Sequence, residues 1–165
     1  EPLKNIPGII EAFTSLRLER GGYELIIAGA GGWNNEDLFG MIEAHEHVRY
    51  IGYVPDNDLP ALFAGATAFL YPSLYEGFGL PVLEAMAAGI PVITSNRTSL
   101  PEITAGAAIM VDPNNIKEIA RAMRDIVRRP SFRASLVEAG KRQAAHYQWQ
   151  KSAQNVLSLC ESYGT

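Results

Sequence analysis

Five short apolar runs, alternating with segments of helical periodicity, constrain the fold of this 165-residue chain more than any other feature. The runs cover residues 23–29, 48–54, 66–72, 90–95 and 107–111, and helical patterns precede the first and separate most of the others. Strands that are apolar at nearly every position are typical of parallel sheets covered by helices on both faces. The sequence therefore predicts an α/β fold, a doubly wound Rossmann-like parallel sheet. Ligands of such sheets bind beyond the carboxyl ends of the strands, here the loops after Ala28, Ile51, Tyr71 and Thr94.

Local signals predict where the helices begin and end. The first helical pattern, residues 6–16, is expected to stop at Gly21–Gly22, and Pro130 is expected to separate two of the last helices. The remaining signals are candidate caps, namely Asp56 and Asp58 before a helix over 59–63, Gly89 after the helix that follows residue 79, and Asn115 before a helix over 116–127.

Length and composition indicate one globular domain and exclude several classes of protein. A formal net charge of −4 gives no reason to expect a nucleic-acid surface. The single cysteine, Cys160, excludes an internal disulfide and a cysteine-built metal site, and the three histidines have no convincing metal-ligand spacing. We therefore expect no metal site. Because no apolar run is long enough to cross a membrane and no export signal is present, we also expect a cytoplasmic protein.

The glycine-rich turn at residues 29–32, GAGG, invites comparison with a dinucleotide-binding fingerprint. Asn34 stands where the third glycine of that fingerprint should be, and no acidic residue ends the next strand. A nicotinamide cofactor is therefore not expected, and the sequence predicts no cofactor of another kind. Gly29 and Gly31 instead allow this loop to pass close to a ligand.

The segment SLYEGFGLPVLEAMAAG, residues 73–89, runs from a glycine-rich loop into a strong helix former. Unpaired N–H groups of residues 77–80 at a helix start, together with the helix dipole, favour an anion such as a diphosphate. Glu76 and Glu84 flank this position with seven residues between them, and carboxylates repel phosphate but accept hydrogen bonds from vicinal hydroxyls. An alternative interpretation is that Glu84 only complements the helix dipole and Glu76 is a solvated loop residue.

Taken in order, several segments resemble retaining glycosyltransferases of the GT-B fold, most closely family 4. The stretch EGFGLPVLEAMAAGIPVI is similar to the family's Glu-x7-Glu motif, and EPLKNIPGIIEAF resembles its lysine-bearing first loop. LIIAGAG, VRYIGYVPDNDLPALFAGATAFLYPS and YQWQKSA resemble further segments of the same family. The similarity covers nearly the whole chain.

The resemblance implies a role for each matched position. Lys4 would bind the donor diphosphate, and Glu76, the candidate catalytic residue, would position hydroxyls of the donor sugar rather than act as a nucleophile. Glu84 would hold the ribose diol. Gly77, Phe78, Gly79 and Leu80 would hold the phosphates and the sugar, and Tyr53 and Val54, in the loop 52–54, would seat the base. The remaining donor-binding positions would be Gly29 and Gly31, in the turn that passes close to the donor, and Ser73. Tyr53, Tyr71 and Tyr75 are otherwise interpreted as packing residues.

The resemblance also implies an organisation larger than these 165 residues. Residues 1–165 would form the carboxyl-terminal, nucleotide-sugar-binding domain, and the amino-terminal acceptor domain would be the partner that completes the site and mediates any membrane association. The family's first strand would lie just upstream of Glu1 and between the runs at 23–29 and 66–72 in space. The donor would be GDP-mannose, weakly favoured by EPLKN, or a UDP-sugar. Two alternatives remain, a nucleotide-sugar epimerase of the GT-B fold and a non-catalytic nucleotide-sugar-binding module.

Overall fold

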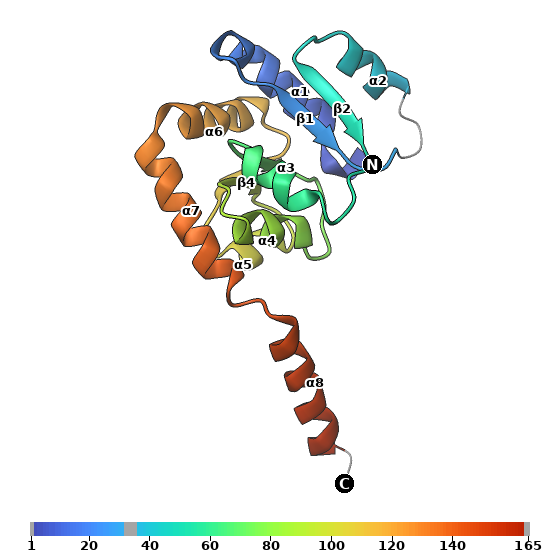
Figure 1. Ribbon diagram of the computed structural model, residues 1–165, viewed down its shortest axis with the longest axis vertical. Helices are drawn as coiled ribbons and strands as arrows, with labels where there is room; N and C mark the ends of the chain where they lie inside the picture. Colours follow the sequence, from blue (N-terminus) through green and yellow to red (C-terminus); the bar gives the residue numbers. More distant parts are fainter. Residues whose placement is uncertain (1, 32–35, 164–165) are drawn as a thin grey trace.

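The fold was analysed in a computed structural model, which describes residues 2–31 and 36–163. The five predicted strands are all present, and they form the centre of an α/β domain (Figure 1). The strands are β1 (Leu25–Ala28), β2 (Val48–Gly52), β3 (Phe69–Tyr71), β4 (Val92–Ser95) and β5 (Ile109–Val111). The helices are α1 (Ile6–Ser15), α2 (Glu36–Glu43), α3 (Leu59–Gly65), α4 (Leu80–Ala87), α5 (Leu100–Thr104), α6 (Ile116–Arg128), α7 (Pro130–Ala144) and α8 (Trp149–Tyr163), with 3-10 turns η1 (Pro2–Lys4) and η2 (Leu18–Gly21).

The strands form two parallel sheets, and the break between them falls between the runs at 23–29 and 66–72, where the sequence predicted the place of the family's first strand. One sheet has the order β1-β2 and the other the order β3-β4-β5. Within the described residues, no hydrogen-bonded pairing joins β1 to β3, as expected if a central strand belongs between them. A cavity of about 1580 Å³ opens between these two strands, lined mainly by apolar side chains of α1, β1, α3 and β3.

Helices cover both faces of the larger sheet, which explains why its strands are apolar throughout. All four residues of β4 are buried. Ile93 packs in a core with α1 and α6, whereas its neighbour Val92 packs in a second core with α4 and α5. Alternation of side chains along a strand sends these neighbours to opposite faces, so each face requires an apolar residue.

The predicted caps agree with the structure at Gly89 and Asn115. Gly89 follows α4 with a φ of 78°, and the Asn115 side chain accepts a hydrogen bond from the N–H of Glu118 at the start of α6. Asp58 occupies the position before α3, but its side chain makes no capping bond. The prediction that the first helix runs to Gly21 was wrong, because α1 ends at Ser15 and a separate 3-10 turn follows.

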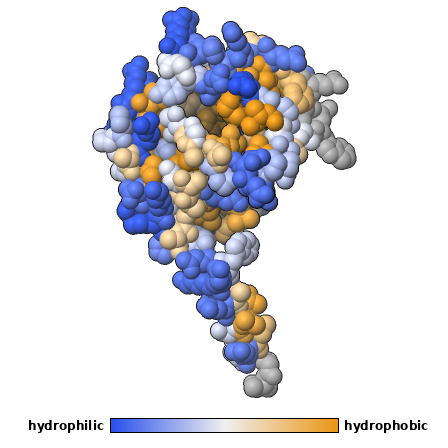
Figure 2. Space-filling model, in the orientation of Figure 1, coloured by the Kyte–Doolittle hydropathy of each residue, from blue (hydrophilic) through white to orange (hydrophobic). Residues whose placement is uncertain are grey.

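The last helix, α8, projects away from the rest of the domain (Figure 1). None of its residues is buried, and Trp149 is 79% exposed. Figure 2 shows apolar side chains gathered along part of this helix, where Val156, Leu157 and Leu159 are exposed. Among the described residues, no helix is long and apolar enough to cross a bilayer.

Candidate donor-binding site

The loop between β3 and α4 presents unpaired backbone N–H groups at a helix start. Gly79 has a φ of 106°, a conformation that glycine adopts at little cost, and it directly precedes α4. Pro81 lies in the first turn of α4, where its missing N–H costs no hydrogen bond. Within the part of the chain that the structure describes, the N–H groups of Gly77, Phe78 and Gly79 donate to no protein acceptor. This loop has the local geometry of an anion site.

Replacing Gly79 by alanine should destabilise the domain far more than the same change at Gly77. A Cβ at residue 79 would lie 2.7 Å from Leu100 Cδ2 and 2.8 Å from Ile103 Cδ1, and both side chains are buried in α5. Strain at positive φ adds to this crowding, so we expect a loss of about 1–3 kcal/mol in the free energy of unfolding. Gly77→Ala is the matched control, because nothing lies within 4 Å of its added Cβ. Urea unfolding curves for the two variants measure the difference, and equal losses would contradict this account of Gly79.

The amino-terminal turn η1 brings Lys4 to this loop. The backbone N–H of Leu74 donates to the carbonyl of Leu3 at 2.8 Å, and the Asn5 side chain donates to the carbonyls of Pro72 and Pro113 at 3.3 and 2.7 Å. These bonds attach residues 3–5 to the ends of β3 and β5. Asn5 adopts a left-handed conformation at the start of α1, and sequence reasoning did not single it out.

Lys4, Tyr71 and Glu76 form a compact polar group at the carboxyl end of β3. The Lys4 ammonium donates to the Tyr71 hydroxyl and to Glu76 Oε1, both at 2.6 Å. Burial alone would lower the pKa of Lys4, but these two hydrogen bonds outweigh burial and raise it. Burial alone would raise the pKa of Glu76, but the hydrogen bond from Lys4 helps to lower it. Burial raises the pKa of Tyr71. At neutral pH the group therefore combines a cation, an anion and a neutral hydroxyl.

The loop after β4 holds the backbone on either side of Gly77. The N–H of Glu76 donates to Thr98 Oγ1 at 3.2 Å. Ser99 Oγ lies 3.1 Å from the carbonyl of Glu76 and 2.8 Å from that of Phe78 and donates to them. The sequence had placed a functional loop after Thr94 but had not identified these two hydroxyl residues. Their signal is the polar run NRTS, residues 96–99, that follows a wholly buried strand.

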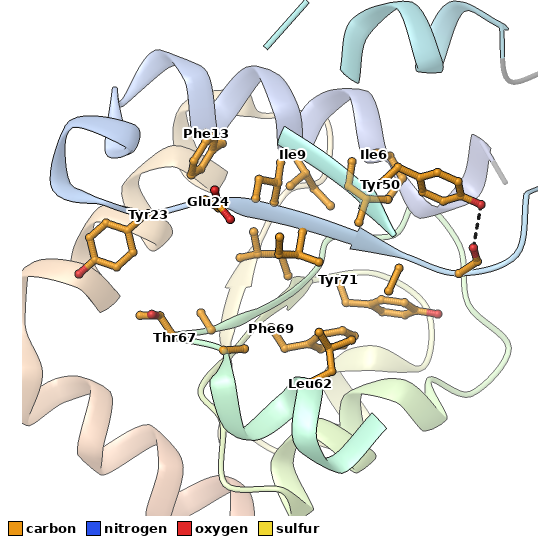
Figure 3. Close-up of a pocket in the computed structure, with 18 of the residues that line it drawn as sticks. Ile6, Ile9, Phe13, Tyr23, Glu24, Tyr50, Leu62, Thr67, Phe69 and Tyr71 are labelled. Carbon is orange, nitrogen blue, oxygen red and sulfur yellow. Dashed lines mark hydrogen bonds between the residues drawn. The ribbon is translucent and has the colours of Figure 1, made fainter. Parts of the chain in front are cut away.

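Lys4, Gly29, Gly31 and Glu84 all line the large cavity. Glu84 lies within α4, and its exposed carboxylate makes no hydrogen bond or ion pair with the described residues. The structure thus brings these four sequence-predicted residues around one space. In Figure 3, apolar side chains that include Ile9 and Phe69 line the middle of the cavity.

The glycine turn after β1 is tied to the end of β2. The N–H of Gly29 donates to the carbonyl of Gly52 at 2.8 Å, and the Tyr50 hydroxyl donates to the carbonyl of Gly29 at 2.9 Å (Figure 3). Tyr53 follows directly and is 68% exposed, while Val54 is half-buried. Neither Tyr53 nor Val54 lines the cavity, although both follow a strand that ends beside Gly29.

Three other predicted donor contacts differ in their exposure. Ser73 is fully buried, and its Oγ has no hydrogen-bond partner within residues 2–31 and 36–163. Phe78 is half exposed and meets the Tyr147 ring edge-to-face, with the ring centroids 6.0 Å apart. Leu80 is exposed at the first residue of α4. Gly32, the last residue of the glycine turn, and Asn34, which argued against a dinucleotide fingerprint, lie outside the described residues.

Comparison with known proteins links this geometry to a family. The family model described as "Glycosyl transferases group 1" matches residues 1–143. O-antigen chain mannosyltransferase B of Escherichia coli is 41% identical over 162 residues, and the MMP alpha-(1->4)-mannosyltransferase of Mycolicibacterium hassiacum is 30% identical over 165 residues. These matches cover 96% and 97% of the chain. The chain spans only 42% and 40% of the two relatives.

Solved structures share the fold at lower sequence identity. Anabaena HepE, crystallised with UDP and glucose, superposes with a TM-score of 0.87 at 19% identity, over 98% of this chain and 46% of HepE. The C-terminal domain of LpcC, a group 1 family glycosyltransferase of Francisella tularensis, superposes with a TM-score of 0.79 at 22% identity. That match covers 88% of this chain and 80% of the LpcC domain. These similarities place the chain in the fold of GT-B glycosyltransferases.

Proposed function

Because this chain belongs to the group 1 glycosyltransferase family, we propose that it binds the nucleotide-diphosphate-sugar donor of a sugar-transfer reaction. The observation that carries the proposal is the arrangement at the end of β3. Lys4 and the unpaired N–H groups of residues 77–79 offer positive charge and donors to a diphosphate, and two carboxylates flank them.

In the proposed reaction, the bond between the anomeric carbon of the sugar and a phosphate oxygen breaks, and the oxygen of an acceptor hydroxyl forms the new bond and loses its proton to the departing phosphate. The departing diphosphate takes the bonding electrons, so a site that stabilises its negative charge lowers the barrier. Lys4 and the start of α4 would supply that stabilisation. Glu76 would accept hydrogen bonds from sugar hydroxyls and so orient the sugar, and we assign the transfer to the retaining class on the resemblance to family 4.

The donor is proposed to be GDP-mannose or a UDP-sugar. Relatives named as mannosyltransferases favour mannose, whereas the HepE structures contain UDP and UDP-glucose. Calorimetric titration with UDP-, GDP- and ADP-sugars would identify the base and the sugar together. Failure of all three to bind would contradict the proposal.

We expect Glu84→Gln to weaken binding of the nucleoside diphosphate by about 1–3 kcal/mol, because the change removes a charge-assisted hydrogen bond to the ribose diol. Glu43→Gln, at the exposed end of α2, is the matched control and should leave the affinity unchanged. Calorimetry measures the affinity, and thermal unfolding measures stability in parallel. If Glu84→Gln lowers the melting temperature but not the affinity, Glu84 serves the helix dipole and the ribose assignment is wrong.

The chain spans about two fifths of the Escherichia coli and Mycolicibacterium hassiacum mannosyltransferases described above, and we propose that a separate acceptor domain completes the site. The alternatives make different predictions. A transferase releases nucleoside diphosphate when an acceptor is added, whereas an epimerase converts the donor without one. A binding module would hold the donor without turnover even when the acceptor domain is supplied.

A further inference from the structure

Tyr71 is a rigidly held residue beside the proposed phosphate site. Its backbone carbonyl accepts a hydrogen bond from Thr94 Oγ1 at 2.9 Å, and its backbone pairs with Thr94 in the parallel sheet. Its ring stacks on Phe69, with the centroids 5.6 Å apart and the planes 19° apart. The half-buried hydroxyl therefore has a fixed position at the carboxyl end of β3.

Lys4 is a long, flexible side chain on a short amino-terminal turn, and Tyr71 restricts it. The Lys4 ammonium lies 2.6 Å from the Tyr71 hydroxyl and 4.9 Å from the centre of the Tyr71 ring. Ordering a lysine on binding is unfavourable, because the free side chain loses the entropy of its many rotamers. Because the fixed Tyr71 side chain already orders Lys4 before a ligand arrives, less side-chain entropy is lost when the ligand binds.

We propose that Tyr71 is a positioning residue, which holds the Lys4 ammonium in place while Lys4 exchanges Glu76 for the donor diphosphate. The inference rests on the proposed function, because it assigns Lys4 to the diphosphate. In the ligand-free domain, Glu76 Oε1 neutralises Lys4 at 2.6 Å. When a diphosphate binds, its oxygens replace this carboxylate, and Glu76 becomes free to accept hydrogen bonds from the sugar.

Tyr71 suits this role because its hydroxyl is neutral. A second carboxylate at this position would compete with phosphate for the ammonium and would repel the incoming anion. A hydroxyl accepts a hydrogen bond from Lys4 without adding negative charge. The bond to Tyr71 can therefore persist while Lys4 changes its anionic partner.

The test compares Tyr71→Phe with Tyr23→Phe in the full-length protein. Tyr23 is also a half-buried tyrosine lining the cavity, but it lies at the opposite end (Figure 3). We expect Tyr71→Phe to weaken UDP or GDP binding about three- to tenfold, the effect of one hydrogen bond. We expect Tyr23→Phe to bind like the unmodified protein and both variants to have similar melting temperatures.

A double-mutant cycle separates positioning from a general structural effect. In a Lys4→Met background, Tyr71→Phe should cause no further loss of nucleoside diphosphate affinity, because its effect passes through Lys4. An undiminished loss in that background, or equal affinities of Tyr71→Phe and Tyr23→Phe, would overturn the inference.

Glu76→Gln tests the exchange itself. If phosphate must displace Glu76 from Lys4, removing the carboxylate charge should leave UDP or GDP binding unchanged or tighter, while binding of the nucleotide-sugar weakens. Weaker nucleoside diphosphate binding by Glu76→Gln would overturn the exchange. If the unmodified protein binds none of UDP, GDP and ADP, the proposed function fails and the inference with it, an outcome distinct from the failure of Tyr71 alone.

Discussion

An apolar strand joined ahead of residue 1 is expected to raise the melting temperature of the 165-residue chain by on the order of 10 °C. The open edges of β1 and β3 face a cavity of about 1580 Å³, so an inserted parallel strand could pair on both sides and bury its side chains among those of α1 and α3. Lys4 and Leu3 are bonded to Tyr71 and Leu74 at the carboxyl end of β3. A strand parallel to β3 would therefore end next to η1, which allows a short connection.

The measurement uses two extensions that differ at one residue. A five-residue segment of valine and isoleucine is compared with the same segment carrying a central proline, which cannot donate to a ladder. Thermal unfolding and light scattering report stability and self-association, since unpaired sheet edges promote aggregation. Equal stabilisation by both segments would show that strand pairing is not the cause.

The 165-residue chain alone is expected to bind donor but to release nucleoside diphosphate at least about a thousandfold more slowly than a two-domain protein. Transfer needs an acceptor hydroxyl held in line with the anomeric carbon, and positioning of this kind supplies much of the rate. In the described part of the chain, Lys4 and residues 77–79 offer hydrogen-bond donors to a diphosphate. None of the residues identified at this site has been given a role in binding the acceptor.

A chimera supplies the comparison for this prediction. Fusing the chain to the amino-terminal part of the Escherichia coli mannosyltransferase, which is 41% identical over the shared region, should restore release from GDP-mannose in the presence of acceptor. Glu84→Gln in the same chimera should reduce the rate at low donor concentration. Rapid release by the 165-residue chain alone would show that it needs no second domain.

The sequence predicted those parts of the fold that depend on local pattern. Each of these parts depends on residues that are neighbours in the sequence. They are the five strands, the glycine loop before α4 and the caps at Gly89 and Asn115. Helix α5 was not predicted, because a five-residue helix is too short to show apolar periodicity. Its Leu100 and Ile103 nevertheless pack against Gly79.

The parts of the site that the sequence missed depend on contacts between distant residues. Tyr71 was interpreted as packing, and its ring does stack on Phe69, but its hydroxyl accepts from Lys4, 67 residues away. Asn5 donates to the carbonyl of Pro113, 108 residues away. Such bonds follow from the sheet order and the path of η1, which no local pattern specifies.

The separation of β1-β2 from β3-β4-β5 has a consequence for folding cooperativity. Within the described residues no strand-to-strand hydrogen bond joins the two sheets, and they are connected mainly by apolar packing, including that of α1 against α6. Amides of β1 and β2 can therefore exchange with solvent through an opening that leaves β4 protected. The 165-residue chain would then unfold as two units, with a calorimetric enthalpy larger than the van't Hoff enthalpy, and a strand between the sheets would merge them into one cooperative transition.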